Sequence, residues 1–117
     1  MSFDFQNLEV YKKAKTFHIN CKHLIETNKL PSYTNNQFGR ASLSIALNIA
    51  EGAGKFSKPD RRNFYITARA SVYECVAIID ILHDEHIISN EIFNDLLRMA
   101  DELSRILYAM IKNLTST

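Results

Sequence analysis

Two histidines of this sequence lie one helical turn apart, and their spacing is the nearest that the chain offers to that of metal ligands on a helix. His83-x-x-His86 would place two ligands on one helix face, with Asp80, Asp84 and Glu85 nearby. A di-iron helical bundle needs Glu-x-x-His pairs on two core helices, whereas this sequence offers Asp80-x-x-His83 once. We therefore interpret the segment as a polar loop at the end of a helix, and we expect no metal ion and no cofactor.

Nucleophilic catalysis would require a serine or cysteine activated by a neighbouring base. Ser42, Ser44 and Ser71 have no histidine beside them in the sequence, and no nucleophile elbow, phosphate-cradling loop or catalytic triad pattern occurs. Cys21 and Cys75 each fall on the apolar face of an expected helix, so we interpret both as small core residues, with a disulfide as the weaker alternative. We expect no catalytic residues.

Basic side chains in the first part of the chain could hold phosphate groups. They form two sets: Lys12, Lys15 and Lys22, then Lys55, Lys58, Arg61 and Arg62. Residues 1–75 carry 11 basic and 6 acidic side chains, whereas residues 76–117 carry 3 and 7, for a net charge of +1. A committed nucleic-acid binder is usually more basic, so an ordinary solvated surface is an equal alternative. A ring of identical subunits would multiply even a modest basic patch.

A polar stripe follows one line along the helix expected around residues 35–53. Its members recur at steps of three and four residues: Gln37, Arg40, Ser44, Asn48 and Glu51. The stripe could form a functional site at a subunit junction. We favour a structural network that fixes helix register, with Arg69 and Glu74 of the next helix as partners, because buried charges need partners.

The same helix is apolar on both sides of this stripe. One side holds Phe38, Ala41, Ile45 and Ile49, and the other holds Leu43, Ala46, Leu47 and Ala50. A helix that is apolar on two sides needs two partners. We therefore infer that one face packs inside its own bundle and the other packs on a second subunit.

The elements that position these residues are expected to be four helices in one domain, residues 1–117. Of the 117 residues, 46% are hydrophobic and only three are Gly and two Pro, which is typical of a globular protein. Helices are predicted at about residues 8–29, 35–53, 58–85 and 90–114, with sustained strand-like alternation absent. Short loops between helices of this length favour an all-α, antiparallel up-down-up-down four-helix bundle.

Cap and stop signals set these boundaries. The predicted N-caps are Asn7, Thr34 with Gln37, Ser57 with Asp60, and Ser89. Pro31 is expected to stop the first helix, and Gly52 and Gly54 to end the second in the left-handed conformation. Residues 1–7 are expected to form an extended lead whose Phe3 and Phe5 dock on the bundle.

The longest apolar runs are too short to span a membrane, and the chain does not begin like a signal peptide. We expect a cytoplasmic protein with no membrane partner.

The segment Arg40-Ala-Ser-Leu-Ser-Ile-Ala-Leu-Asn-Ile-Ala-Glu-Gly52 resembles the signature of the four helix bundle proteins, also called the 23S rRNA intervening-sequence proteins. Residues 5–14, residues 64–74 and the heptad-like fourth helix are similar to the same family, so the resemblance covers nearly the whole chain. The family usually has Pro where this chain has Ala46 and Gly where it has Ala70. Both replacements favour helix.

The resemblance implies a small bacterial protein, often encoded inside insertions of 23S rRNA genes, whose biochemical role is largely unassigned. Relatives include the accessory subunit of diversity-generating retroelements, which forms a barrel-like homopentamer and binds nucleic acid and a reverse transcriptase. The implied function is a non-enzymatic, homopentameric accessory that contacts RNA or DNA. A protein-interaction scaffold whose partner meets the acidic fourth helix is the alternative, and an enzyme or metal protein is a third.

Overall fold

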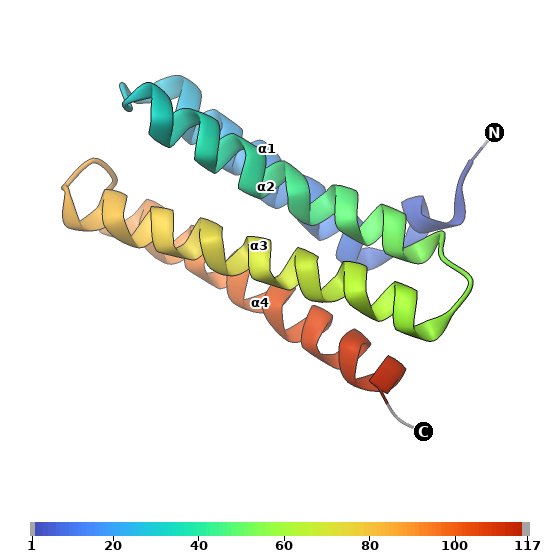
Figure 1. Cartoon of the computed structure of the whole chain (residues 1–117). Coiled ribbons are helices and arrows are strands. Elements are labelled where there is room, and N and C mark those ends of the chain that lie inside the picture. The colour runs from blue at the N-terminus through green and yellow to red at the C-terminus, as the bar shows by residue number, and fades with distance from the viewer. Residues whose placement is uncertain (1, 116–117) are drawn as a thin grey trace.

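Four long helices and one short 3-10 helix make up the part of the chain that the computed structural model describes, residues 2–115. The elements are η1 Asp4–Asn7, α1 Glu9–Thr27, α2 Ser32–Ala53, α3 Lys58–Asp84 and α4 Asn90–Thr115. These residues contain no β-strand, and consecutive long helices run in opposite directions (Figure 1). The predicted all-α four-helix bundle is thus confirmed, while residues 1, 116 and 117 lie outside the described residues.

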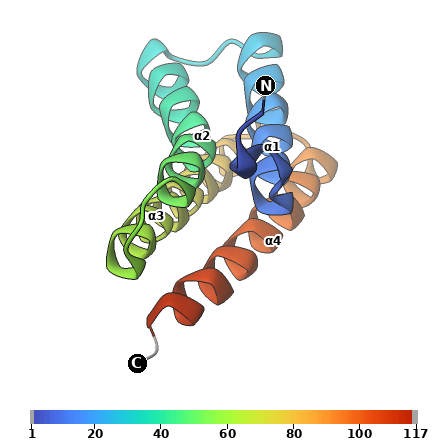
Figure 2. The same ribbon diagram turned by 90° about the vertical axis from the view of Figure 1, so that its right-hand side faces the viewer.

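The core forms where the apolar stripes of the four helices meet. α2 packs against α1 and α3, and α4 packs against α3 and, less extensively, against α1. Figure 2 shows the C-terminal half of α4 diverging from α1. The large side chains with almost no solvent exposure are Phe17, Phe38, Ile45, Ile49, Ile79, Leu82, Leu103 and Leu107. Burying each stabilises the fold by about 1.5–3 kcal/mol.

The two apolar faces of α2 have different environments in the folded chain. Its inner face is buried in the bundle core as predicted, with Phe38 and Ile45 fully buried. On the outer face, Leu43 is 43% exposed and Leu47 is 51% exposed. Ala46 was predicted on the outer face but is buried, because it borders the inner face on the helical wheel. The outer apolar face is therefore narrower than predicted.

Two of the predicted N-caps are confirmed. The backbone N–H of Asp60 donates to Ser57 Oγ at 3.2 Å, at the start of α3. The backbone N–H of Ile92 donates in the same way to Ser89 Oγ at 3.2 Å, at the start of α4. Each cap satisfies a backbone donor that a helix start leaves without an intrahelical partner.

The other two predicted caps are wrong. Asn7 belongs to η1, and Leu8 takes the N-cap position of α1. α2 begins at Ser32 because the carbonyl oxygen of extended Pro31 already accepts the backbone N–H groups of Thr34 and the following residue, at 3.0 and 3.1 Å. Thr34 therefore lies in the first turn of α2 rather than before it.

Gly52 is needed for close packing rather than for a left-handed helix end. No glycine within residues 2–115 has a positive φ, and Gly54 after α2 has a φ of −85°. A Cβ on Gly52 would lie 2.7 Å from Cε1 of Tyr65 and 3.0 Å from Cβ of Phe64. The left-handed residue is instead His86, with a φ of 60°, just after α3.

The N-terminal lead is helical rather than extended. η1 brings the Phe5 ring edge-on to Tyr11, with the ring centroids 4.8 Å apart. Phe3 stacks on Phe5 but is 62% exposed, so it is the less covered of the two rings. Residue 1 of the predicted lead lies outside the described residues.

Within residues 2–115, no helix combines the length and the hydropathy required to cross a lipid bilayer.

Candidate functional site

Most of the predicted phosphate-contacting residues lie at one end of the bundle. The first turns of α1, the α2–α3 loop and the start of α3 share this end in Figure 1 and face the viewer in Figure 2. We call it the basic end and define it by Lys12, Lys15, Lys55, Lys58, Arg61 and Arg62. Lys22 lies two turns farther along α1. The structure therefore does not bring Lys22 together with the other six residues.

Aromatic rings and backbone groups hold several of these cations in place. Lys15 Nζ lies 5.0 Å from the ring centroid of Tyr11, and Lys55 Nζ lies 5.1 Å from that of Phe64. Arg61 Nε donates to the carbonyl oxygen of Lys55 at 2.6 Å, which ties the α2–α3 loop to the first turn of α3. The lysine side chains remain exposed. Lys15, Lys55 and Arg61 are therefore held by contacts within the chain, while Lys12 pairs with Glu9 at 3.5 Å.

Phe56, in the α2–α3 loop, is an aromatic residue that the sequence analysis did not identify. Its side chain is fully exposed, and it stands between Lys55 and Lys58 in the sequence. Proteins that bind single-stranded nucleic acid combine aromatic rings, on which bases stack, with cations that track the backbone. The signal was present in the sequence as Lys-Phe-Ser-Lys in a predicted loop.

The polar stripe of α2 reaches α3 at two places. Ser71 Oγ donates to Ser44 Oγ at 3.0 Å. Asn48 Nδ2 donates to the Oγ and the carbonyl oxygen of Ser44, at 2.9 and 2.8 Å. Near the other end of α2, the Gln37 amide donates to the carboxylate of Glu74. The Ser71–Ser44 and Gln37–Glu74 hydrogen bonds join two turns of α2 to α3, whereas those of Asn48 lie within α2.

The charged members of the stripe remain outside these contacts. Arg40 and Glu51 have exposed side chains. The ion pairs of the described chain are Lys12–Glu9, Lys13–Glu102, Arg98–Asp95 and Arg105–Asp101. Among residues 2–115, neither Arg40 nor Glu51 therefore has an opposite charge within ion-pair distance.

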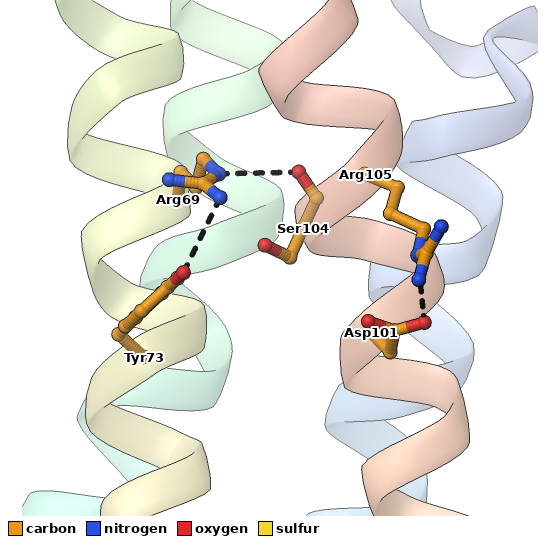
Figure 3. Close-up of polar contacts among 5 residues, drawn as sticks. All are labelled: Arg69, Tyr73, Asp101, Ser104 and Arg105. Carbon is orange, nitrogen blue, oxygen red and sulfur yellow. Dashed lines mark hydrogen bonds and ion pairs between the residues drawn. The ribbon is translucent and has the colours of Figure 1, made fainter.

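Arg69 points to α4 rather than to α2 (Figure 3). Its Nε donates to the backbone oxygen of Ser104 at 3.2 Å, and one terminal nitrogen donates to the Tyr73 hydroxyl at 3.3 Å. The guanidinium carbon also lies 5.0 Å from the Tyr73 ring centroid and 5.5 Å from that of Tyr108. Arg69 is thus fixed in the groove between α3 and α4.

A histidine does lie next to one of the serines, contrary to the expectation from sequence. His18 Nδ1 is 2.8 Å from Ser42 Oγ, and Ser42 Oγ also donates to the carbonyl oxygen of Gly39 at 3.3 Å. Burial, followed by the charge of Lys22, lowers the pKa of His18 from its ordinary value of 6.5. Because Ser42 is fully buried, no substrate reaches its Oγ, and the pair serves to join α1 to α2.

The two cysteines are core residues, as predicted. Both are free thiols with fully buried side chains. Burial raises the pKa of Cys75 to about 12, with a smaller contribution from Glu74. Burial also raises the pKa of Cys21. Neither thiol is therefore a ready nucleophile at neutral pH.

His83 packs against α4 instead of lying in a loop with the other polar residues. Its Nε2 lies 2.6 Å from Asn90 Oδ1, and its ring stacks on that of Phe93 at 4.0 Å. His83 is still within α3, and only Glu85 and His86 of the candidate cluster follow the helix. The described residues contain no group of three or more side chains placed to hold a metal ion.

Comparison with known proteins identifies the family. The model of the family described as 23S rRNA-intervening sequence protein matches residues 6–109. The crystal structure of a protein of unknown function from the S23 ribosomal protein family of Bacteroides thetaiotaomicron has the same fold, with a TM-score of 0.80. The two chains are 21% identical, and the match covers 88% of this chain and 98% of that one. No curated protein matches this sequence significantly. On the family match over most of its length, the chain belongs to the 23S rRNA-intervening sequence protein family.

Proposed function

We propose that this protein is a non-enzymatic, homo-oligomeric cytoplasmic accessory that contacts the phosphate backbone of RNA or DNA through its basic end. The observation behind the proposal is the gathering of six cations from α1, the α2–α3 loop and α3 at one end of the bundle. Phosphate contacts by lysine and arginine supply most of the affinity of non-specific nucleic-acid binding. Exposed Phe56 adds a ring on which a base can stack.

Assembly is part of this proposal because the net charge of a single chain is only +1. The exposed Leu43 and Leu47 on α2 favour a second copy as the partner of that face. Family resemblance favours five subunits. Repetition of the basic end around an assembly would raise the local density of cations without changing the charge of one subunit.

The alternative, a scaffold whose partner meets the acidic α4, has less support. Three acidic side chains of α4 already have cations beside them in the same chain. Glu102 pairs with Lys13 at 2.9 Å and raises the pKa of that lysine, chiefly through their hydrogen bond. The other two, Asp95 and Asp101, pair with arginines on α4 itself at 3.0 and 2.9 Å.

Fluorescence anisotropy with a labelled single-stranded RNA, measured over a range of salt concentrations, tests the proposal. We expect affinity to fall steeply with salt, and the variant Lys55→Gln/Lys58→Gln to reduce the slope of log K against log salt by roughly 1.4, about 0.7 for each lost contact. Phe56→Ala should weaken binding by roughly 1–3 kcal/mol if a base stacks there.

The matched control is Lys29→Gln, an exposed lysine between α1 and α2 at the opposite end of the bundle. It should leave the slope unchanged. Absence of RNA and DNA binding at low salt would contradict the proposal. An equal effect of the control would assign the binding to diffuse surface charge instead.

A further inference from the structure

A second apolar stripe runs along the outer surface of α3. Ile66, Tyr73 and Ile81 are 46%, 59% and 56% exposed, and exposed Ala70 and Ala77 lie between them. Successive members are four, three, four and four residues apart, which is the spacing of side chains that face a neighbouring helix. Tyr73 also lines the groove between α3 and α4, together with Ile66 and Tyr108. Nothing within residues 2–115 covers this surface.

The outer faces of α2 and α3 carry the same pattern in opposite directions. Along α2 the pattern is Arg40, Leu43, Leu47, Glu51, with steps of three, four and four residues. Read backward along α3 it is Asp80, Ala77, Tyr73, Arg69, again with steps of three, four and four. Each set places two apolar side chains between a cation and an anion.

We propose that the outer face of α2 in one copy docks antiparallel on the outer face of α3 in the next copy. Arg40 then lies opposite Asp80, Glu51 lies opposite Arg69, and the two leucines meet Ala77 and Tyr73. A parallel docking would set Arg40 against Arg69 and Glu51 against Asp80, so like charges disfavour it. This inference rests on the homo-oligomer of the proposed function and specifies its interface.

The charges involved are available for such contacts. Arg40, Glu51 and Asp80 are exposed, and none of the ion pairs among residues 2–115 includes them or Arg69. The contacts to Ser104 and to two tyrosine rings hold the Arg69 guanidinium beside the stripe (Figure 3). A cation already fixed in position loses less conformational freedom when it binds a carboxylate.

The contact joins two different surfaces, so every copy has one of each and the docking continues from copy to copy. Such heterologous contacts produce closed rings or open filaments. A symmetric contact of α2 with α2 of a second copy is the competing arrangement, with Arg40 opposite Glu51. The symmetric contact would leave the apolar stripe on α3 uncovered. It would also set residue steps of three, four and four along one α2 against steps of four, four and three along the other, so the two patterns would not match in register.

Charge exchange between the two faces tests the register. Mass by multi-angle light scattering would be measured for Arg40→Asp, Asp80→Arg and the double variant, with circular dichroism to establish that each is folded. We expect each single variant to dissociate at least tenfold more readily than the wild type, and the double variant to regain the wild-type mass. In an equimolar mixture of the two single variants, contacts between unlike copies regain opposite charges, so the mass should rise above that of either variant alone. A ring of five copies would still keep one like-charge contact. Lys29→Asp is the control and should leave the mass unchanged, because this exposed lysine lies outside both faces and in none of the ion pairs among residues 2–115.

The outcomes separate the interface from the proposed function. Folded single variants that dissociate without rescue in the double variant would overturn the register. Rescue of Arg40→Glu by Glu51→Arg instead would show the symmetric α2 contact and overturn the proposal. Single variants that keep the wild-type mass would also overturn it while leaving the homo-oligomer intact. A monomeric wild type would overturn both the proposed interface and the homo-oligomer of the proposed function.

Discussion

Adding one methyl group at two glycines of α2 should have opposite effects on stability. Gly39 and Gly52 both lie within α2, where replacing Gly by Ala favours the helix by about 0.8–1 kcal/mol. At Gly39 the nearest atom to a new Cβ is Ile25 Cδ1 at 3.9 Å, an ordinary contact. Gly39→Ala should therefore stabilise the protein by about 0.5–1 kcal/mol.

At Gly52 the new Cβ meets atoms that have little room to move. Tyr65 Cε1 would be 2.7 Å away, and Tyr65 itself is only 5% exposed. Phe64 Cβ, at 3.0 Å, is attached directly to the backbone of α3. Overpacking of this kind costs about 1–3 kcal/mol, which exceeds the gain in helix propensity. Gly52→Ala should therefore destabilise the protein by about 1 kcal/mol, within a range of roughly 0–2.

Urea denaturation followed by circular dichroism would measure both variants against the wild type. The protomer concentration must be the same throughout, because assembly shifts apparent stability by mass action. We expect the two variants to differ by about 2 kcal/mol, with m-values unchanged. If Gly52→Ala is as stable as Gly39→Ala, the close approach of α2 to Tyr65 is not what requires a glycine there.

Three further predictions concern side chains that the fold buries fully or in part: His18, the two cysteines and Asn48. Because the pKa of His18 lies below 6.5 in the folded chain, the unfolded chain binds the extra proton first. The free energy of unfolding should therefore fall as pH drops below about 6.5, and His18→Asn should reduce this fall in pH-dependent urea titrations. Cys21 and Cys75 should resist a thiol reagent in the native protein and react fully in urea, whereas rapid native reaction would contradict their burial. Asn48→Leu should change oligomer mass or melting temperature, since it removes both hydrogen bonds to Ser44, and no change in either would show that the network has no structural role.

Helix periodicity predicted the bundle because it depends on local spacing alone. Ser57 and Ser89 were predicted correctly as caps for the same reason: each bonds to a backbone N–H three residues away. Thr34 has an equally good capping pattern, but the carbonyl oxygen of Pro31 begins the helix one turn earlier. A local pattern cannot decide between two competing starts of one helix.

The tertiary contacts were not predictable because they join residues far apart in the sequence. His18 and Ser42 are 24 residues apart, and Arg69 and Ser104 are 35 apart. The rule that buried charges need partners pairs Arg69 with the polar stripe of α2. In the fold, however, Arg69 points toward α4 and lies against Tyr73 of α3 and Tyr108 of α4. The role of Gly52 likewise depends on where Tyr65 packs, which the type of residue alone does not reveal.

The proposed function depends first on a partner for the outer face of α2. The most direct test compares the native mass of the wild type with that of Leu43→Gln/Leu47→Gln, at micromolar concentration and with helix content measured in parallel. We expect a wild-type mass several times that of the 13.4 kDa chain and a folded variant of lower mass. A wild type that stays monomeric at micromolar concentration, with both leucines in water, would contradict the account.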